Sequence, residues 1–281
     1  MTDFSGILIC TDLDGTLLSN DLTISKENRE AIAYFQAHGG YFTFVTGRMP
    51  FFVERIYTAI APNAPFGCIN GGGLYDHRAG RYIWLQELTR EVLPLLEAVD
   101  RAFPHVGIQV NTPHCVYFCK ENDTMRYFRE ATGVPNLVRG YREVEEPFAK
   151  IVFGSQDGDE LESVAHTLRT HPLAERFDFI RSERTLFEIL PRGIGKGVAI
   201  AKLSEYLGID PHKTIAIGDY NNDISMFRSA ALGIAVANAC PEAKAAADAV
   251  TVSNEEHAIA RVINDLEHGV YALGENQNRL C

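Results

Sequence analysis

Two aspartates, Asp12 and Asp14, follow the apolar segment Ile7–Cys10 after Thr11 and precede Gly15. In extended backbone, residues i and i+2 point the same way, so we expect both carboxylates to project together. Two ionised carboxylates about 4 Å apart repel by roughly 4 kcal/mol at an effective dielectric near 20, so the pair requires a cation or a shared proton. The alternative is a turn that these carboxylates stabilise before Gly15. We favour a functional pair.

A second acidic pair, Asp219 and Asp223, follows the apolar segment Thr214–Ile217 and Gly218. Capping of a helix N-terminus is an adequate alternative for Asp223, but it explains Asp219 less well. Carboxylates at the ends of adjacent parallel strands provide the oxygen ligands that Mg²⁺ prefers. The two acidic pairs together therefore predict a magnesium site.

Cationic and polar groups lie where they would favour a phosphate at such a site. Lys196, flanked by glycines, begins a predicted helix, although a solvated lysine is an alternative there. Thr46, Gly47 and Arg48 follow a predicted strand and offer a hydroxyl, an exposed N–H and a guanidinium to phosphate oxygens. A carboxylate cluster alone repels phosphate, whereas a bound cation and these groups attract it.

The glycine-rich segment Asn70–Gly73 forms a further loop after the apolar segment Phe66–Ile69. Turn formation explains such a composition, and so does contact with a ligand at a strand end. Both interpretations stay open at this point.

Short apolar segments alternate with helical patterns at both ends of the chain. The predicted strands are Ile7–Cys10, Tyr41–Val45, Thr214–Ile217 and Gly233–Val236, and the predicted helices include Ser25–Ala37, Gly197–Leu207 and Ile224–Ala230. Continuous apolar strands separated by helices are typical of a parallel sheet covered on both faces. We therefore predict an α/β fold with a doubly wound, Rossmann-like core.

The middle of the chain has a different pattern. An amphipathic helix is predicted over Val92–Phe103, and strands at Gly107–Asn111, Cys115–Cys119, Ala149–Phe153, Phe177–Ile180 and Thr185–Leu190. Pairs of strands joined by short turns indicate an antiparallel sheet backed by helices. We predict an inserted α+β cap at residues 86–189 and a core formed by residues 1–85 and 190–281.

Composition limits the classes of partner. The 281 residues include 26 Lys and Arg against 37 Asp and Glu, a net charge of −11, which disfavours nucleic acid or an anionic membrane. No apolar run approaches the ~18 residues that span a bilayer, and the N-terminus lacks a signal-peptide pattern, so we expect a cytoplasmic protein. The sequence leaves the oligomeric state open.

The six cysteines are scattered along the chain and are expected to be reduced thiols. Cys115 and Cys119 lie near His114, which raises the question of a metal site. Because the segment between them is apolar and structural zinc sites need four well-spaced ligands, a buried strand is the better interpretation.

Four segments in their order along the chain resemble the four motifs of haloacid-dehalogenase-like phosphatases. They are Asp12–Thr16, Thr46–Arg48, Lys196, and Gly218–Asp219 with Asn222–Asp223. The insertion between the second and third motifs is similar to the large α/β cap of the Cof-type subgroup, and so are Asn70–Gly72, Phe187–Pro191 and Asp223–Met226. The resemblance covers nearly the whole chain.

The resemblance implies a Mg²⁺-dependent phosphatase. Asp12 would be the nucleophile that forms an aspartyl-phosphate, and Asp14 would protonate the leaving oxygen and then deprotonate water. Phosphate would be bound by Thr46, Gly47, Arg48, Lys196 and Asn222, and Asn222 would position phosphate or Lys196. Lys196 would also be catalytic, because it would temper the charge on Asp12. The metal would be held by the Asp12 carboxylate, the Asp14 main-chain carbonyl, Asp219, and Asp223 directly or through water.

The expected substrate is a small phosphorylated metabolite, such as a sugar phosphate or a phosphorylated cofactor, and the cap is expected to select its organic part. Two alternatives remain. A phosphomutase would use the same nucleophile but return the phosphoryl group to a substrate. A non-catalytic phosphate-sensing protein would not need Asp14, an acid two residues from the nucleophile.

Overall fold

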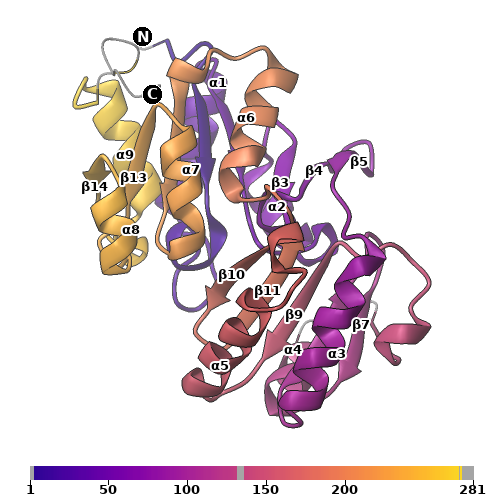
Figure 1. Ribbon diagram of the computed structural model, residues 1–281. Helices are drawn as coiled ribbons and strands as arrows, with labels where there is room; N and C mark the ends of the chain where they lie inside the picture. The colour runs from indigo at the N-terminus through magenta and orange to yellow at the C-terminus, as the bar shows by residue number, and fades with distance from the viewer. Residues whose placement is uncertain (1–2, 132–135, 272, 274–281) are drawn as a thin grey trace. The chain divides into compact units, whose positions relative to one another are not determined.

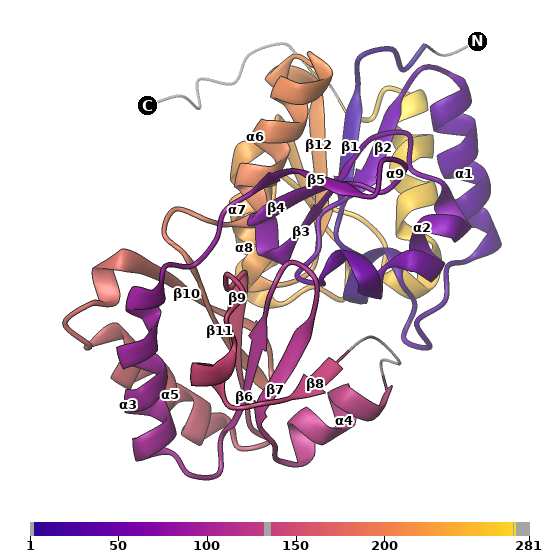
Figure 2. The ribbon, with the colours of Figure 1, turned by 90° about the vertical axis from the view of Figure 1, so that its right-hand side faces the viewer.

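The computed structural model describes residues 3–131, 136–271 and 273 (Figures 1 and 2). The chain divides into two compact units, one formed by Met1–Ile83 with Gly195–Cys281 and the other by Trp84–Ile194. The insertion predicted at 86–189 lies within the second unit, which extends beyond it at both ends.

A parallel sheet forms the centre of the first unit, in the strand order β14-β13-β12-β1-β2. The strands are β1 (Leu8–Thr11), β2 (Tyr41–Phe44), β12 (Thr214–Gly218), β13 (Leu232–Ala235) and β14 (Ala249–Val250), and each neighbouring pair is parallel. In this register Thr11 lies opposite both Phe44 and Ile217. The residues that follow these three positions therefore emerge at the same edge of the sheet. The predicted α/β fold with a parallel core is confirmed.

Helices cover both faces of this sheet, as Figure 2 shows. One side carries α6 (Lys196–Leu207), α7 (Ile224–Ser229) and α8 (Pro241–Ala246), and the other carries α1 (Lys26–Ala37) and α9 (Ala258–Glu267). A further helix, α2 (Glu54–Ile60), follows β2 in the chain. Because α9 buries Ile259, Val262 and Ile263 as one stripe, it packs as an amphipathic helix.

A small three-stranded sheet also belongs to the first unit, in the order β3-β4-β5. It consists of β3 (Phe66–Cys68), β4 (Gly73–Asp76) and β5 (Arg81–Leu85), and the last of these leads into the second unit. Gly67 bridges to Val45, which places β3 beside the end of β2. The strands β4 and β5 are not predictable from the sequence, because their residues are mostly half-buried and lack a strong alternating pattern.

The second unit is a six-stranded sheet in the order β10-β11-β9-β6-β7-β8. Its strands are β6 (Gly107–Asn111), β7 (Val116–Lys120), β8 (Asn136–Val138), β9 (Lys150–Gly154), β10 (Phe177–Glu183) and β11 (Leu186–Pro191). All neighbours are antiparallel except β7 and β8, which are parallel and flank α4 (Asp123–Ala131) in the chain. The predicted antiparallel sheet is therefore mixed at one edge.

The two faces of this sheet differ in polarity. One face contributes Ile108, Val110, Ile151, Phe153, Phe187 and Ile189 to an apolar core with residues of α3 (Leu93–Ala102) and α5 (Gly158–Arg169). The alternate positions, which point to the other face, include Gln109, Asn111, Lys150 and Glu188. Lys150 Nζ lies 3.0 Å from each carboxylate oxygen of Glu188, and both side chains are buried.

Of the helices in the described ranges, none combines the length and apolar character that crossing a membrane requires.

Candidate active site

The site forms where β1 and β12 end, and backbone contacts fix both loops. The Asp12 N–H donates to the Ile217 carbonyl at 2.8 Å, which joins the two strand ends. Gly15 has φ +76°, and a Cβ there would lie 2.6 Å from Asp219 Oδ2. A Cβ at Gly218 would lie 2.5 Å from Asp223 Cγ. Glycine at position 15 therefore lets the two acidic loops approach each other closely, and glycine at position 218 leaves room for the Asp223 carboxylate within its own loop.

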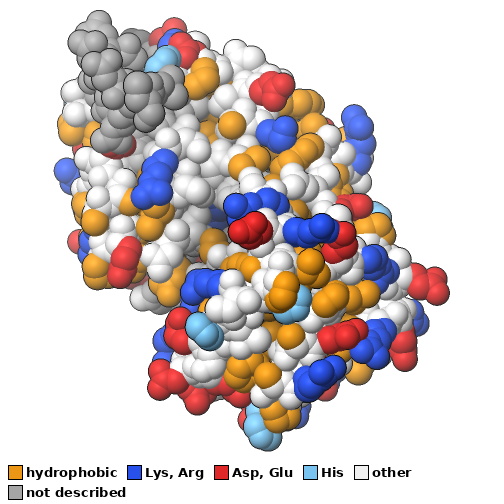
Figure 3. Space-filling model, in the orientation of Figure 1, with side chains coloured by type: hydrophobic (Ala, Val, Ile, Leu, Met, Phe, Trp, Pro, Cys, Tyr) orange, Lys and Arg blue, Asp and Glu red, His pale blue; other side chains and the backbone are white. Residues whose placement is uncertain are grey.

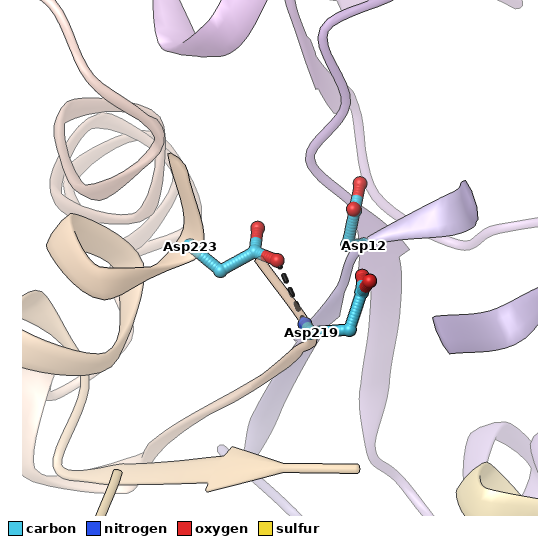
Figure 4. Close-up of side chains that lie close together, drawn as sticks. All are labelled: Asp12, Asp219 and Asp223. Atoms are coloured by element: carbon cyan, nitrogen blue, oxygen red, sulfur yellow. Dashed lines mark hydrogen bonds between the residues drawn. The ribbon is translucent and has the colours of Figure 1, made fainter. Parts of the chain in front are cut away.

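Three carboxylates converge at this edge of the sheet. Asp12, Asp219 and Asp223 each offer an oxygen within 4.8 Å of the others (Figure 4). Asp223 Oδ2 accepts hydrogen bonds from the N–H groups of Asp219 at 2.8 Å and Tyr220 at 3.0 Å. The Thr16 hydroxyl donates to Asp219 Oδ1 at 2.9 Å. The backbone and one hydroxyl thus hold two of the three carboxylates in place.

Lys196 is the cation at the centre of this cluster. Its Nζ lies 2.7 Å from Asp12 Oδ1 and 2.6 Å from Asp223 Oδ1, and the residue is 1% exposed. Burial acts to lower the pKa of Lys196, but the two carboxylates outweigh it and hold that pKa above its usual value. Lys196 is therefore a charged ammonium, and the alternative of a solvated lysine is wrong.

The charges at the site do not balance. Three carboxylates and one ammonium sum to −2 when all are ionised (−3 + 1 = −2). Burial raises the pKa of Asp12 well above its usual value; Lys196 opposes this rise, and the neighbouring carboxylates add to it. Burial and then Asp223 raise the pKa of Asp219 to about 6. A divalent cation matches both the charge deficit and the all-oxygen donor set, so the residues present fit a bound metal.

Asp14 and Arg48 form a pair of their own beside this cluster. Arg48 Nε donates to Asp14 Oδ2 at 2.9 Å and Nη2 donates to Oδ1 at 2.5 Å. The Asp14 side chain is 44% exposed and lies outside the group of three converging carboxylates. Arg48, which the sequence reading assigned to phosphate, thus holds Asp14 in this structure.

The other predicted phosphate-binding residues line the same strand ends. Thr46 is buried, and its hydroxyl accepts a hydrogen bond from the Arg48 N–H at 3.2 Å. Asn222 is buried and donates from Nδ2 to Asn70 Oδ1 at 3.1 Å. Gly47 lies against Asn70, since a Cβ at Gly47 would be 3.0 Å from Asn70 Oδ1.

The sequence leaves both a turn and a ligand contact open for Asn70 and does not single out Thr16, although both residues contact predicted site residues. Thr16 lies four positions after Asp12, so its spacing from the strand end was the available signal. Asn70 is paired with a residue 152 positions away, and local sequence patterns carry no information about such a contact.

Comparison with known proteins covers all four motif segments, from Asp12 to Asp223. The family model of haloacid dehalogenase-like hydrolases matches residues 9–263. The chain belongs to this family. The predicted resemblance is confirmed, and the protein is a phosphoric monoester hydrolase of the haloacid dehalogenase-like type.

Two bacterial relatives match along nearly their whole length. The 5-amino-6-(5-phospho-D-ribitylamino)uracil phosphatase YwtE of Bacillus subtilis is 31% identical over 94% of this chain and 99% of its own. The phosphatase YwpJ of the same organism is 28% identical over 92% and 99%. The crystal structure of a haloacid dehalogenase-like hydrolase from Bacteroides thetaiotaomicron superposes with a TM-score of 0.80 at 26% identity, over 92% of this chain and 99% of that one.

Proposed function

We propose that this hydrolase is a Mg²⁺-dependent phosphatase that cleaves small phosphorylated metabolites through an aspartyl-phosphate on Asp12. The observation that carries the proposal is the convergence of Asp12, Asp219 and Asp223 around Lys196 at one sheet edge. Such a cluster attracts a divalent cation, and the positive charges of the cation and Lys196 favour binding of a phosphate.

Asp12, Asp219, Asp223 and the Asp14 main-chain carbonyl would hold the metal in this proposal. When bound, the metal supplies positive charge that favours the ionised carboxylates and offsets the negative charge of the phosphoryl oxygens. Mg²⁺ is the cation best suited to a few carboxylates together with substrate oxygens and water. Whether Asp223 binds it directly or through water does not alter this role.

Among the three clustered carboxylates, Asp12 is the best nucleophile. Asp223 accepts two backbone N–H groups and the Lys196 ammonium, and Asp219 accepts the Thr16 hydroxyl. Asp12 pairs with Lys196 through Oδ1, and no described residue hydrogen-bonds to its Oδ2. That oxygen is therefore the one available to attack phosphorus. The attack breaks the bond between phosphorus and the alcohol oxygen and leaves the phosphoryl group on Asp12.

Lys196, Thr46 and Asn222 would orient the transferred group. The Lys196 ammonium would stabilise the negative charge of both Asp12 and a phosphoryl oxygen. The Thr46 hydroxyl would donate a hydrogen bond to another phosphoryl oxygen. Gly47 and Arg48 complete the same loop, and Arg48 also holds Asp14 by two hydrogen bonds. The loop would therefore position the phosphate and the acid together.

Asp14 is proposed to protonate the leaving alcohol oxygen and then to take a proton from the water that attacks the phosphorylated Asp12. We expect Asp14→Asn to lower kcat by about 10²- to 10⁴-fold for alkyl phosphates, the usual range for loss of a general acid. The loss should be smaller for p-nitrophenyl phosphate, whose leaving group needs little protonation. Steady-state kinetics with both ester types measure this, and an equal loss for both would refute the acid role.

The substrate class is proposed from the relatives. YwtE is named a 5-amino-6-(5-phospho-D-ribitylamino)uracil phosphatase, so that ester and related sugar phosphates are the first compounds to test. The experiment is a comparison of kcat/KM over a panel of phosphorylated metabolites with Mg²⁺. Release of inorganic phosphate supports the phosphatase, whereas a phosphorylated product without phosphate release would indicate a phosphomutase. Absence of turnover on every ester would indicate a phosphate-sensing protein.

A small-molecule substrate also agrees with the charge of the protein. The net charge of −11 opposes binding of polyanions, and on the face drawn in Figure 3 basic and acidic side chains are interspersed. We propose that the protein acts in the cytoplasm and that its partners are small phosphate esters instead of nucleic acids or membranes.

The unit at Trp84–Ile194 is proposed to act as a cap that governs specificity and supplies no catalytic group. Gln109 and Asn111 lie on the polar face of its sheet and suit contacts with a polar leaving group. We expect Gln109→Ala and Asn111→Ala to change kcat/KM by different factors for different metabolite esters, with little effect on acetyl phosphate. Kinetics over the substrate panel measure this, and an equal loss for every compound would contradict it.

A further inference from the structure

The turn that follows β3 has an unusual backbone. Three consecutive residues lie in the left-handed region, with φ of +56° at Ile69, +51° at Asn70 and +89° at Gly71. A β-branched residue such as isoleucine rarely adopts this conformation, and such strain persists only where the surrounding structure enforces it. The backbone of this turn is therefore held by its neighbours instead of by its own preferences.

Hydrogen bonds show that the neighbours are the phosphate-binding segments. The Asn70 N–H donates to the Thr46 carbonyl at 3.0 Å, and the Ile69 N–H donates to the Arg48 carbonyl at 3.1 Å. On the other side of the turn, a Cβ at Gly71 would lie 2.1 Å from the carbonyl oxygen of Gly195. The turn thus packs between the loop of Thr46 and the residue that precedes Lys196.

The side chain of Asn70 reaches a third segment. Asn70 is fully buried, and its Oδ1 accepts a hydrogen bond from Asn222 Nδ2 at 3.1 Å. Asn222 Oδ1 is buried as well and has no hydrogen-bond partner among the described residues. The Asn70 carboxamide therefore fixes one end of the Asn222 side chain. Asn222 Nδ2 carries a second N–H, which can donate to a phosphoryl oxygen, whereas Asn222 Oδ1 can only accept, for example from a water molecule.

We propose that Asn70 is a positioning residue of the phosphate site, which rests on the proposed function. Its carboxamide sets the orientation of the Asn222 side chain. Its turn fixes the backbone positions of Thr46 and of the residue before Lys196. Groups from three distant segments can therefore contact the same phosphoryl group. The ligand class is a tetrahedral phosphate or the phosphoryl group of an ester. Asn70 acts through Asn222 and does not itself contact the reacting atoms.

The test compares Asn70→Gly with Asn70→Ala, because glycine accepts φ +51° without strain and removes only the side chain. We expect both variants to lower kcat/KM for p-nitrophenyl phosphate and to raise the inhibition constant of orthovanadate by about 10- to 100-fold, the scale of losing an orienting partner. Asn222→Ala should show a similar loss. The double variant Asn70→Gly with Asn222→Ala should have the same kcat/KM and the same orthovanadate inhibition constant as Asn222→Ala alone, because the two side chains act as one hydrogen-bonded pair.

Asn63→Ala is the matched control. Asn63 accepts from the Phe42 N–H at 2.8 Å and donates to the Gly40 carbonyl at 2.9 Å, at the opposite end of β2 from Thr46. Its loss should lower the melting temperature and leave the orthovanadate constant unchanged. Asn70→Gly with wild-type kinetics, or losses that add in the double variant, would overturn the proposal. A wild-type protein that hydrolyses no ester would instead refute the proposed function.

Discussion

Asp12→Asn is expected to reduce kcat by ~10⁴-fold or more, because an amide oxygen is a poor nucleophile and a poor ligand for Mg²⁺. The variant should fold normally. Burial raises the pKa of Asp12 well above its usual value, so the ionised carboxylate opposes folding at neutral pH, and this penalty disappears only as the pH falls below the unfolded-state pKa. The metal-free variant should therefore melt at or above the temperature of the metal-free wild type.

Asp265→Asn is the matched control for this variant. Asp265 is a buried aspartate of the same unit, and it accepts two hydrogen bonds from Arg261 Nε, at 2.9 and 2.8 Å. The control should lose some stability and retain kcat. Substantial turnover by pure Asp12→Asn would show that Asp12 is not the nucleophile.

Removal of the metal is expected to stop turnover completely, and added Mg²⁺ should restore it. Ca²⁺ should bind but inhibit, because it is larger, takes more ligands and disturbs an in-line geometry. Added Mg²⁺ should also raise the melting temperature of the wild type, because it binds the folded state, and it should raise that of Asp12→Asn less. Full activity after exhaustive treatment with EDTA would contradict the metal site.

The Mg²⁺ requirement should depend on pH in a defined direction. Burial raises the pKa of Asp219 to about 6 in the metal-free protein, so a proton competes with the cation below that pH. The Mg²⁺ concentration for half-maximal activity should therefore rise by at least about tenfold per pH unit below pH 6, because a proton on Asp12, whose pKa is also raised, competes with the cation as well. Titrations of activity with Mg²⁺ between pH 5 and 8 provide the measurement.

The sequence was informative where short-range rules decide the structure. Asp12 and Asp219 follow apolar strands, and parallel strands end at one edge, so their convergence was predictable from strand order alone. The fold class followed for the same reason. By contrast, the partner of Arg48 was not predictable, because its guanidinium fits either a phosphate or a carboxylate with equal geometry. The structure places it on Asp14.

Features that depend on contacts between residues far apart in the sequence could not be predicted from it. Asn70 looked like an ordinary turn residue, because its role depends on a contact with Asn222 that no local pattern records. The short edge strand β8 has exposed apolar residues at Leu137 and Val138, so it lacks the alternation that marks a half-buried strand. Its parallel pairing with β7 is a tertiary effect.

The most direct test of the mechanism is chemical capture of the phosphorylated enzyme. Asp14→Asn should accumulate the intermediate from p-nitrophenyl phosphate, because this leaving group needs little protonation whereas hydrolysis of the aspartyl-phosphate loses its base. The variant would be mixed with Mg²⁺ and this ester, quenched in acid and reduced with borohydride. Borohydride converts an acyl phosphate to an alcohol, so mass spectrometry should find homoserine in place of aspartate at position 12 and aspartate unchanged at positions 219 and 223. Turnover with no reduced aspartate, or with reduction at another position, would contradict the account.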